Sequence, residues 1–139
     1  MKIYTSYFAQ FSTLTKAGIM PVSIALVSPW FHGEKCTYLA PTRKILQFKE
    51  EPEKYTDHFN RLVLAPLDFS EVIEDFKNLS HGKDIALLCY ERPGVFCHRH
   101  LVANWLNAYI ECHPKGIGLE SVKEYQKPND FPMFANVVL

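Results

Sequence analysis

The chain lacks an excess of charge of either sign. Fifteen Lys and Arg residues balance fifteen Asp and Glu residues among 139 residues, and the six histidines add no formal charge. A protein that binds DNA or an anionic membrane over its whole surface carries a strong basic excess. We therefore expect no extended nucleic-acid surface, and any binding site for an anion must be local.

Long apolar segments are also missing. No window approaches the roughly 20 apolar residues of a membrane span, and the first residues lack the apolar core of a signal peptide. These absences predict a cytoplasmic protein without a membrane partner. Because 47% of the residues are hydrophobic and only 22% are charged, we expect one compact globular domain over residues 1–139.

Cysteine is scarce, with four residues at Cys36, Cys89, Cys97 and Cys112. Cytoplasmic thiols stay reduced, so we expect buried apolar residues, reactive thiols or metal ligands here instead of disulfide partners. Cys36 and Cys112 have no supporting arrangement beside them and are assigned to the core. Seven residues separate Cys89 from Cys97, unlike the roughly two-to-four-residue spacing of structural zinc sites. We expect no metal, with a zinc-binding domain as an alternative.

Apolar runs predict the strands. Two nearly continuous runs cover residues 19–27 and 84–90, and a shorter β-branched and aromatic segment covers residues 2–8. Strands that are apolar on both faces are typical of parallel sheets covered by helices. A last strand is expected within residues 117–122, followed by an apolar tail over residues 123–139.

Apolar residues at helical spacing predict the intervening helices. We expect helices over residues 12–16, 53–64 and 98–110, and another that begins at a capping box over residues 68–71 and ends at Gly82. Strands that alternate with helices predict a three-layer, Rossmann-like α/β fold with a mostly parallel sheet of about four strands and helices on both faces.

Ligands of such folds bind at the carboxyl ends of the strands. The rule selects three loops: the one after the first strand, with Ser6 and Tyr7; the one over residues 28–43, with Ser28 and Trp30; and the one over residues 91–98. We predict that these four side chains contribute to ligand binding. For Trp30, a position that fills the core is an equally good interpretation.

Residues 89–100 hold the densest cluster of reactive side chains. They include two thiols, one carboxylate, two arginines and two imidazoles, on Cys89, Cys97, Glu91, Arg92, Arg99, His98 and His100. The free N–H groups and the dipole at a helix start stabilise an anion. A thiolate at Cys97, or a bound phosphate or carboxylate, is therefore favoured there.

Positive charge at the same helix start is disfavoured, so an acid should offset Arg99. Glu91 is the internal candidate, and an anion held by Arg99 or Arg92 is the external one. We predict catalytic roles for Cys97, Glu91 and His98, and ligand-binding roles for Arg99, Cys89 and Arg92. The alternative for Cys89 alone is a place in the core, and His100 is expected to be exposed.

Common catalytic motifs are absent. The chain has no glycine-rich dinucleotide or phosphate loop, no zinc-protease motif and no serine nucleophile motif. Neither Cys89 nor Cys97 has the spacing from Arg99 that the phosphate-binding loop of protein tyrosine phosphatases requires. The sequence therefore identifies a site without naming a reaction or a cofactor, and it leaves the oligomeric state open.

The order of residues within the cluster resembles the bacterial and phage family known as "domain of unknown function 488". Its signature is a strand that ends in Cys-x-Glu, here Cys89 and Glu91, and a helix that opens with Cys-His-Arg, here Cys97, His98 and Arg99. The resemblance is specific over residues 84–106 and weaker over residues 2–65. It departs at two loops, where Thr5-Ser6-Tyr7-Phe8 replaces Gly-His-Ser-Asn and Leu26-Val27-Ser28 replaces Asp-Val-Arg. It implies an α/β fold and a site at the cluster, with no settled activity.

Two functions from different classes follow from these observations. The first is an enzyme that binds an anionic small molecule, such as a nucleotide or a nucleic-acid-derived group, at the Cys97-His98-Arg99 helix start. In it Arg99 anchors the anion, and Glu91 orients an arginine or acts as general base. The second is a non-enzymatic interaction domain in which Glu91, His98 and Arg99 form a structural network.

Overall fold

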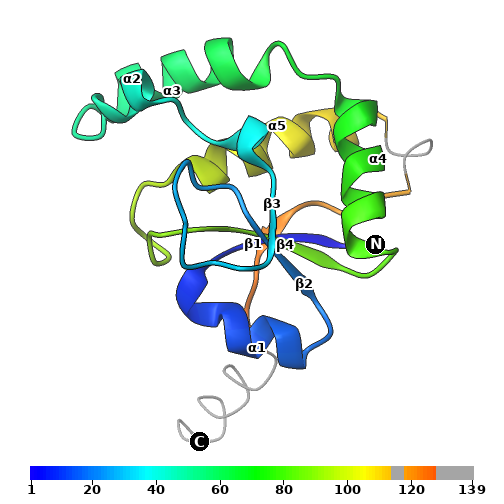
Figure 1. The fold of residues 1–139 in the computed structure, drawn as a ribbon. Helices are drawn as coiled ribbons and strands as arrows, with labels where there is room; N and C mark the ends of the chain where they lie inside the picture. Colours follow the sequence, from blue (N-terminus) through cyan, green and yellow to red (C-terminus); the bar gives the residue numbers. More distant parts are fainter. Residues whose placement is uncertain (114–117, 128–139) are drawn as a thin grey trace, which may run out of the picture.

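The computed structural model describes residues 1–113 and 118–127, which form a parallel sheet with helices on both faces (Figure 1). The predicted α/β class is confirmed, although the sheet has five strands instead of about four. The strands lie in the order β3-β2-β4-β1-β5, and every pairing is parallel. They are β1 (Ile3–Tyr7), β2 (Met20–Ser23), β3 (Glu34–Lys35), β4 (Ile85–Cys89) and β5 (Lys123–Glu124).

Five α-helices connect these strands within the described residues. They are α1 (Phe11–Lys16), α2 (Arg43–Leu46), α3 (Pro52–Phe59), α4 (Phe69–Ser80) and α5 (His98–Cys112). Short 3₁₀ turns occur at Phe8–Gln10 and Thr37–Leu39, and α3 continues as a π-helical turn over Asn60–Leu64. In Figure 1, α1 lies on one side of the sheet and α3, α4 and α5 lie on the other.

The central strand β4 is apolar on both faces because both faces are covered. Ile85 and Leu87 pack into the larger core, under α3, α4 and α5. Ala86 and Leu88 pack into the smaller core on the α1 side. All four are completely buried, and alternate residues of a strand point to opposite faces of the sheet. The continuous apolar run therefore reflects a strand between two helical layers.

The predicted capping box sets the start of α4. The side chain of Asp68 accepts a hydrogen bond from the Glu71 N–H at 3.1 Å. At the other end His81 adopts the left-handed conformation, with φ of 54°, and Gly82 follows with φ of 81°. The helix thus ends at Ser80, slightly before the glycine that predicts its end.

The second predicted strand is shorter than its apolar run. Only Met20–Ser23 pairs in the sheet, although the Ile24 N–H still donates to the Leu88 carbonyl at 2.9 Å. The chain then turns, because the Ser23 hydroxyl accepts from the Ala25 N–H at 3.3 Å and bonds the Ser28 hydroxyl at 2.9 Å. Ile24 and Ala25 stay buried after the strand ends. Their apolar character therefore makes the strand predicted from the sequence too long.

The last strand lies after the predicted position. Residues 118–122 form no strand, and β5 is Lys123–Glu124. The reason is Asn107 of α5, whose side chain bonds both the N–H and the carbonyl of Val122, at 2.7 and 3.1 Å. The prediction over residues 117–122 is therefore wrong for its described part. Residue 117 and residues 128–139 of the predicted apolar tail lie outside the described residues.

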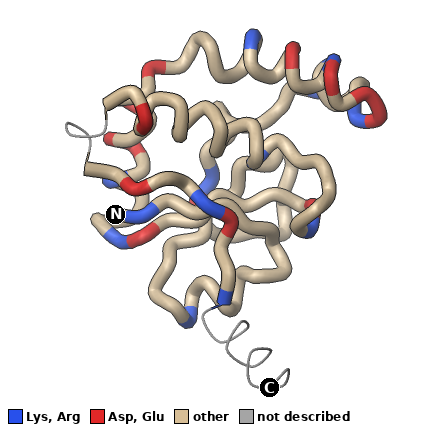
Figure 2. The backbone as a smooth tube through the Cα atoms, turned by 180° about the vertical axis from the view of Figure 1, so that it is seen from behind, with Lys and Arg blue, Asp and Glu red and all other residues tan. Residues whose placement is uncertain are grey.

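Figure 2 shows basic and acidic residues mixed along the backbone instead of gathered by sign. Among the described helices, none has the length and apolar character needed to cross a bilayer.

The two cysteines assigned to the core differ in exposure. Cys36 is buried, as expected, whereas Cys112 is exposed at the last residue of α5, so its predicted burial is wrong. Cys112 ends a helix whose apolar face is already completed by Ile110. Cys36 lies near the carboxylate of Asp75, which accepts a hydrogen bond from the Tyr38 hydroxyl at 2.6 Å. Burial raises the pKa of the Cys36 thiol to about 11.

We predict that these two thiols differ in reactivity in the folded protein. At pH 8, iodoacetamide should modify Cys112 promptly and leave Cys36 unmodified, because Cys36 is both buried and protonated. Peptide mass spectrometry measures both residues in one sample, and denaturant-unfolded protein is the control in which both react. Modification of native Cys36 as fast as Cys112 would contradict the buried position.

Candidate functional site

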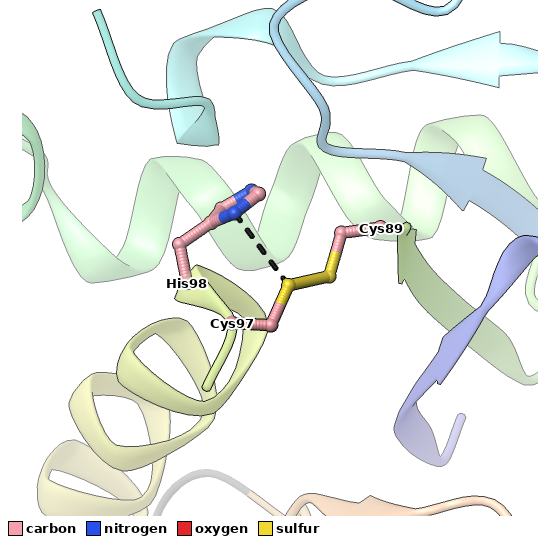
Figure 3. Close-up of side chains that lie close together, drawn as sticks. All are labelled: Cys89, Cys97 and His98. Atoms are coloured by element: carbon pink, nitrogen blue, oxygen red, sulfur yellow. Dashed lines mark hydrogen bonds between the residues drawn. A yellow bond between two sulfur atoms is a disulfide. The ribbon is translucent and has the colours of Figure 1, made fainter. Parts of the chain in front are cut away.

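The connection from β4 to α5 brings two cysteines into contact. Cys89 is the last residue of β4 and Cys97 is the N-cap of α5, and both are buried. Their sulfurs are joined in a disulfide, although the residues are eight positions apart (Figure 3). The expectation that no cysteine pairs is therefore wrong for these two. A reducing compartment argues against disulfides in general. Here the short loop after β4 brings Cys97 back beside Cys89, at the end of the strand.

His98, the first residue of α5, has a fixed orientation. Its Nε2 lies 2.6 Å from the Ile24 carbonyl, which only accepts, so Nε2 carries the proton. Its Nδ1 lies 3.8 Å from the Cys97 sulfur. Burial lowers the pKa of His98 to about 4, against the opposing effect of the hydrogen bond to Ile24. The ring is therefore neutral near pH 7, and Nδ1 presents a lone pair to the two sulfurs.

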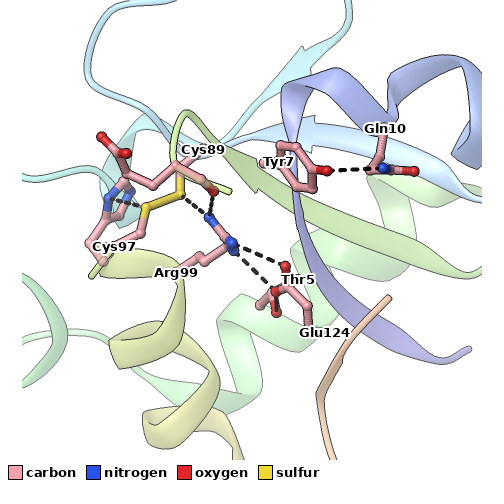
Figure 4. A network of polar contacts seen from close by, with 9 residues as sticks. Thr5, Tyr7, Gln10, Cys89, Cys97, Arg99 and Glu124 are labelled. Carbon is pink, nitrogen blue, oxygen red and sulfur yellow. Dashed lines mark hydrogen bonds and ion pairs between the residues drawn. A yellow bond between two sulfur atoms is a disulfide. The ribbon is translucent and has the colours of Figure 1, made fainter. Parts of the chain in front are cut away.

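Arg99 is completely buried and bonds to groups of the protein itself (Figure 4). Its Nε and Nη2 donate to the two carboxylate oxygens of Glu124, at 3.1 and 3.0 Å. Its Nη1 donates to the Cys89 sulfur at 3.1 Å and to the backbone carbonyl of Glu91. The Thr5 hydroxyl also donates to Glu124, at 2.6 Å. One guanidinium thus joins α5, the loop after β4 and the edge strand β5.

The acid that offsets Arg99 is Glu124 and not the Glu91 carboxylate. Glu91 contributes only its carbonyl to this network, and its side chain pairs loosely with Lys49 at 3.9 Å. The interpretation that the Glu91 carboxylate offsets the charge of Arg99 is therefore wrong, because Glu124 occupies that position. Glu124 has no motif around it, and only pairing of β5 with β1 brings it near. Binding of an external anion by Arg99 stays a prediction. In the structure the guanidinium donates its hydrogen bonds to groups of the protein itself.

A pocket of about 190 Å³ opens beside the disulfide. Four predicted site residues line it: Cys89, Glu91, Cys97 and His98. The sequence interpretation missed the other eight lining residues, among them Lys49 before α3, Tyr55 on α3 and Phe96 in the loop. The rings of Tyr55 and Phe96 meet edge to face, with centroids 5.1 Å apart. The pocket therefore joins a charged rim to an aromatic wall.

The remaining predicted residues do not line this pocket. Ser6 is buried and its hydroxyl has no partner among the described residues, and Ser28 bonds Ser23. The Tyr7 hydroxyl accepts from the Gln10 amide at 3.2 Å, as Figure 4 shows. Trp30 is 52% exposed, packed on Phe8 instead of filling the core, and Arg92 is exposed. His100, expected to be exposed, is half-buried, which lowers its pKa.

The start of α5 is electrostatically open. Its first turn contains no acidic residue, and the Cys97 side chain makes no capping hydrogen bond. The first N–H groups of a helix and its dipole stabilise negative charge at that end. A thiolate at Cys97, or an anionic group in the pocket, would meet this partial positive charge.

We predict that Arg99→Ala strongly destabilises the protein. The change leaves the carboxylate of Glu124 without its cation in a mostly buried position, which costs about 3–5 kcal/mol. Denaturant unfolding followed by circular dichroism measures the loss. The matched control is Arg92→Ala in the same segment, which removes an exposed arginine and should stay within about 0.5 kcal/mol. Equal stability of the two variants would contradict the structural role of Arg99.

Comparison with known proteins identifies the family of the chain. A family model described as the active DUF488-N3 subclade, DUF488-N3a, matches residues 23–110. The match contains the whole connection from β4 to α5, whereas residues 2–22 lie outside it. No curated protein matches the chain, and no solved structure does. Because the matched segment covers more than half of the 139 residues, the chain belongs to the DUF488 family, in its DUF488-N3a subclade.

Proposed function

We propose that this protein is an enzyme that binds an anionic small molecule of the nucleotide class in the pocket at the start of α5. One observation carries the proposal: Cys97 and the Nδ1 atom of a neutral His98 meet in a pocket at an uncapped helix N-terminus. Reactive cysteines occupy such partly enclosed, electropositive places, whereas inert ones are packed in the core.

The pocket supplies complementary groups for such a molecule. Lys49 lies on its rim, and with the first N–H groups of α5 it can receive a phosphate or carboxylate. Tyr55 and Phe96 offer an aromatic wall to a planar ring. Two of the features that a nucleotide requires, an anion site and a flat apolar surface, therefore lie in one cavity.

Roles for the reactive groups follow from their positions. Reduced Cys97 is the reacting thiolate, with its sulfur placed by the N-cap position and by His98. Glu91, 35% exposed beside Lys49, is the general base that exchanges protons with solvent. A cytoplasmic location, expected from the sequence, supplies the reducing conditions that this form needs. The description of the matched subclade as active agrees with an enzymatic function.

A non-enzymatic interaction domain is the second candidate, favoured by the network of Arg99. That network holds the loop and α5 together through Glu124 and needs no ligand. Loss of stability on changing Arg99 therefore fits both candidates. They differ in the pocket, where an interaction domain requires neither a reactive thiol nor an anion site.

We predict that nucleoside monophosphates stabilise the reduced protein and that the matching nucleosides do so much less. A ligand at about 100 times its Kd stabilises the folded state by about 2.7 kcal/mol, which raises Tm by several degrees. Lys49→Ala should weaken phosphate-dependent binding by roughly tenfold, through loss of one charge-assisted contact. Lys44→Ala, an exposed lysine outside the pocket, is the control and should bind normally. No shift with nucleotides, phosphate or sulfate would refute anion binding.

We also predict that the bound molecule protects Cys97. In reduced protein, iodoacetamide should label Cys97, which lines the pocket, and a saturating nucleotide should slow that labelling. Exposed Cys112 is the internal control, because its labelling should not change. If Cys97 labels no faster than buried Cys36, the thiol is inert and the interaction-domain candidate gains support.

A further inference from the structure

We propose that the sulfurs of reduced Cys89 and Cys97 and the Nδ1 atom of His98 together bind one divalent transition-metal ion, with zinc as the best match. The inference rests on the proposed function in placing the reaction at this cluster, and metal binding is measured independently of nucleotide binding. The sequence offers zinc only as an alternative to the expected absence of a metal, and the family match assigns no metal to these residues.

The three donor atoms already lie together. They are within 4.8 Å of one another, and each residue is buried, with exposures of 1%, 6% and 6% for Cys89, Cys97 and His98. The Cα atoms of the two cysteines are 7.3 Å apart, which is wider than the roughly 4.4–6.8 Å usual for disulfide pairs. An ion placed between two sulfurs, each about 2.3 Å away, suits cysteines with such separated backbones.

The orientation of His98 is that of a metal ligand. Ligating histidines usually donate their second ring N–H to a carboxylate or a backbone carbonyl, which fixes the tautomer. Here Nε2 donates to the Ile24 carbonyl at 2.6 Å and leaves the lone pair of Nδ1 toward the cysteines (Figure 3). Cys89 has a similar supporting contact, because Arg99 donates to its sulfur at 3.1 Å.

Charge balance favours a divalent ion in this buried place. Two thiolates and a neutral imidazole carry a charge of −2, which one divalent cation cancels. The neighbouring Arg99 and Glu124 cancel each other at 3.0 Å and leave no residual charge. Thiolate and imidazole donors together favour zinc over magnesium or calcium. A dithiol or phosphine reductant first supplies the two electrons that convert the disulfide into two thiols. Metal binding then releases the two thiol protons, so that two thiols and the ion give a dithiolate complex and two protons.

The spacing of the cysteines fits an open site. Spacings of roughly two to four residues describe closed structural sites, in which one turn supplies a pair of ligands. Here one cysteine ends a strand and the other begins a helix. Three protein ligands and a fourth position that faces a cavity are typical of catalytic zinc. The 190 Å³ pocket, with Glu91 on its lining, provides that cavity. When bound, the ion would keep Cys97 as a thiolate and polarise a molecule in the pocket.

Cobalt binding tests the proposal directly. The protein is purified without a metal-affinity tag, reduced with a phosphine under anaerobic conditions and titrated with Co²⁺. We expect one Co²⁺ per chain, with thiolate-to-cobalt charge-transfer absorption and the intense visible bands of a tetrahedral ion. Zn²⁺ should displace the cobalt, and elemental analysis should then find one zinc per chain.

Variants assign the ligands. Cys89→Ser, Cys97→Ser and His98→Gln should each weaken Co²⁺ binding by more than the roughly 10–100-fold cost of losing a supporting partner. Cys36→Ser and Cys112→Ser are the matched controls, because these cysteines lie outside the cluster, and they should bind as the unchanged protein does. Circular dichroism checks that each variant folds. If a variant does not fold, the cobalt absorption spectrum of the unchanged protein still tests the site.

Each outcome supports or overturns one of the two proposals. Absence of a thiolate-to-cobalt band in the reduced protein, or a disulfide that persists in the reductant, overturns the metal site. So does a band that survives in Cys97→Ser and Cys89→Ser. If the protein binds the metal but nucleotides do not raise its Tm, the nucleotide pocket is overturned and the metal site stands. Nucleotide binding that depends on Lys49, in a protein that takes up no cobalt, overturns the metal site alone.

Discussion

The buried ion pair between Arg99 and Glu124 is the interaction on which the rest of the site depends. A guanidinium with no exposed surface is stable only when its donors are satisfied, and here Glu124, the Cys89 sulfur and the Glu91 carbonyl satisfy them. These partners come from β5, the end of β4 and the following loop. The pair therefore fixes where α5 begins relative to the edge of the sheet.

The chemistry of the pocket follows from that fixed helix start. With α5 held in place, Cys97 lies at an uncapped N-terminus, His98 reaches the Ile24 carbonyl, and Cys89 lies beside both. The turn after β2 has a part in this, because it presents the Ile24 carbonyl to the ring instead of continuing the strand. Reactive side chains from the end of β4 and the start of α5 thus converge, and the turn after β2 holds one of them in place.

The sequence predicts the elements better than it predicts the partners. Continuous apolar runs predict β4 and the start of β2 because buried parallel strands need them, and the capping box predicts α4 for a local reason. The cluster of Cys89, Glu91, Cys97 and His98 is also local. Glu124 and Lys49 could not be predicted, because each approaches the site only through tertiary packing. The same holds for Val122, which Asn107 withdraws from strand pairing.

Cys89, Cys97 and His98 lie together at the start of α5, where the proposed metal ion would bind. Anomalous X-ray diffraction from crystals of the reduced protein loaded with zinc shows whether the ion binds there. We expect one anomalous peak within bonding distance of the two sulfurs and of the Nδ1 atom of His98, with its open side toward the pocket. Reduced thiols with no peak between them, or a peak bound only by other residues, would contradict it.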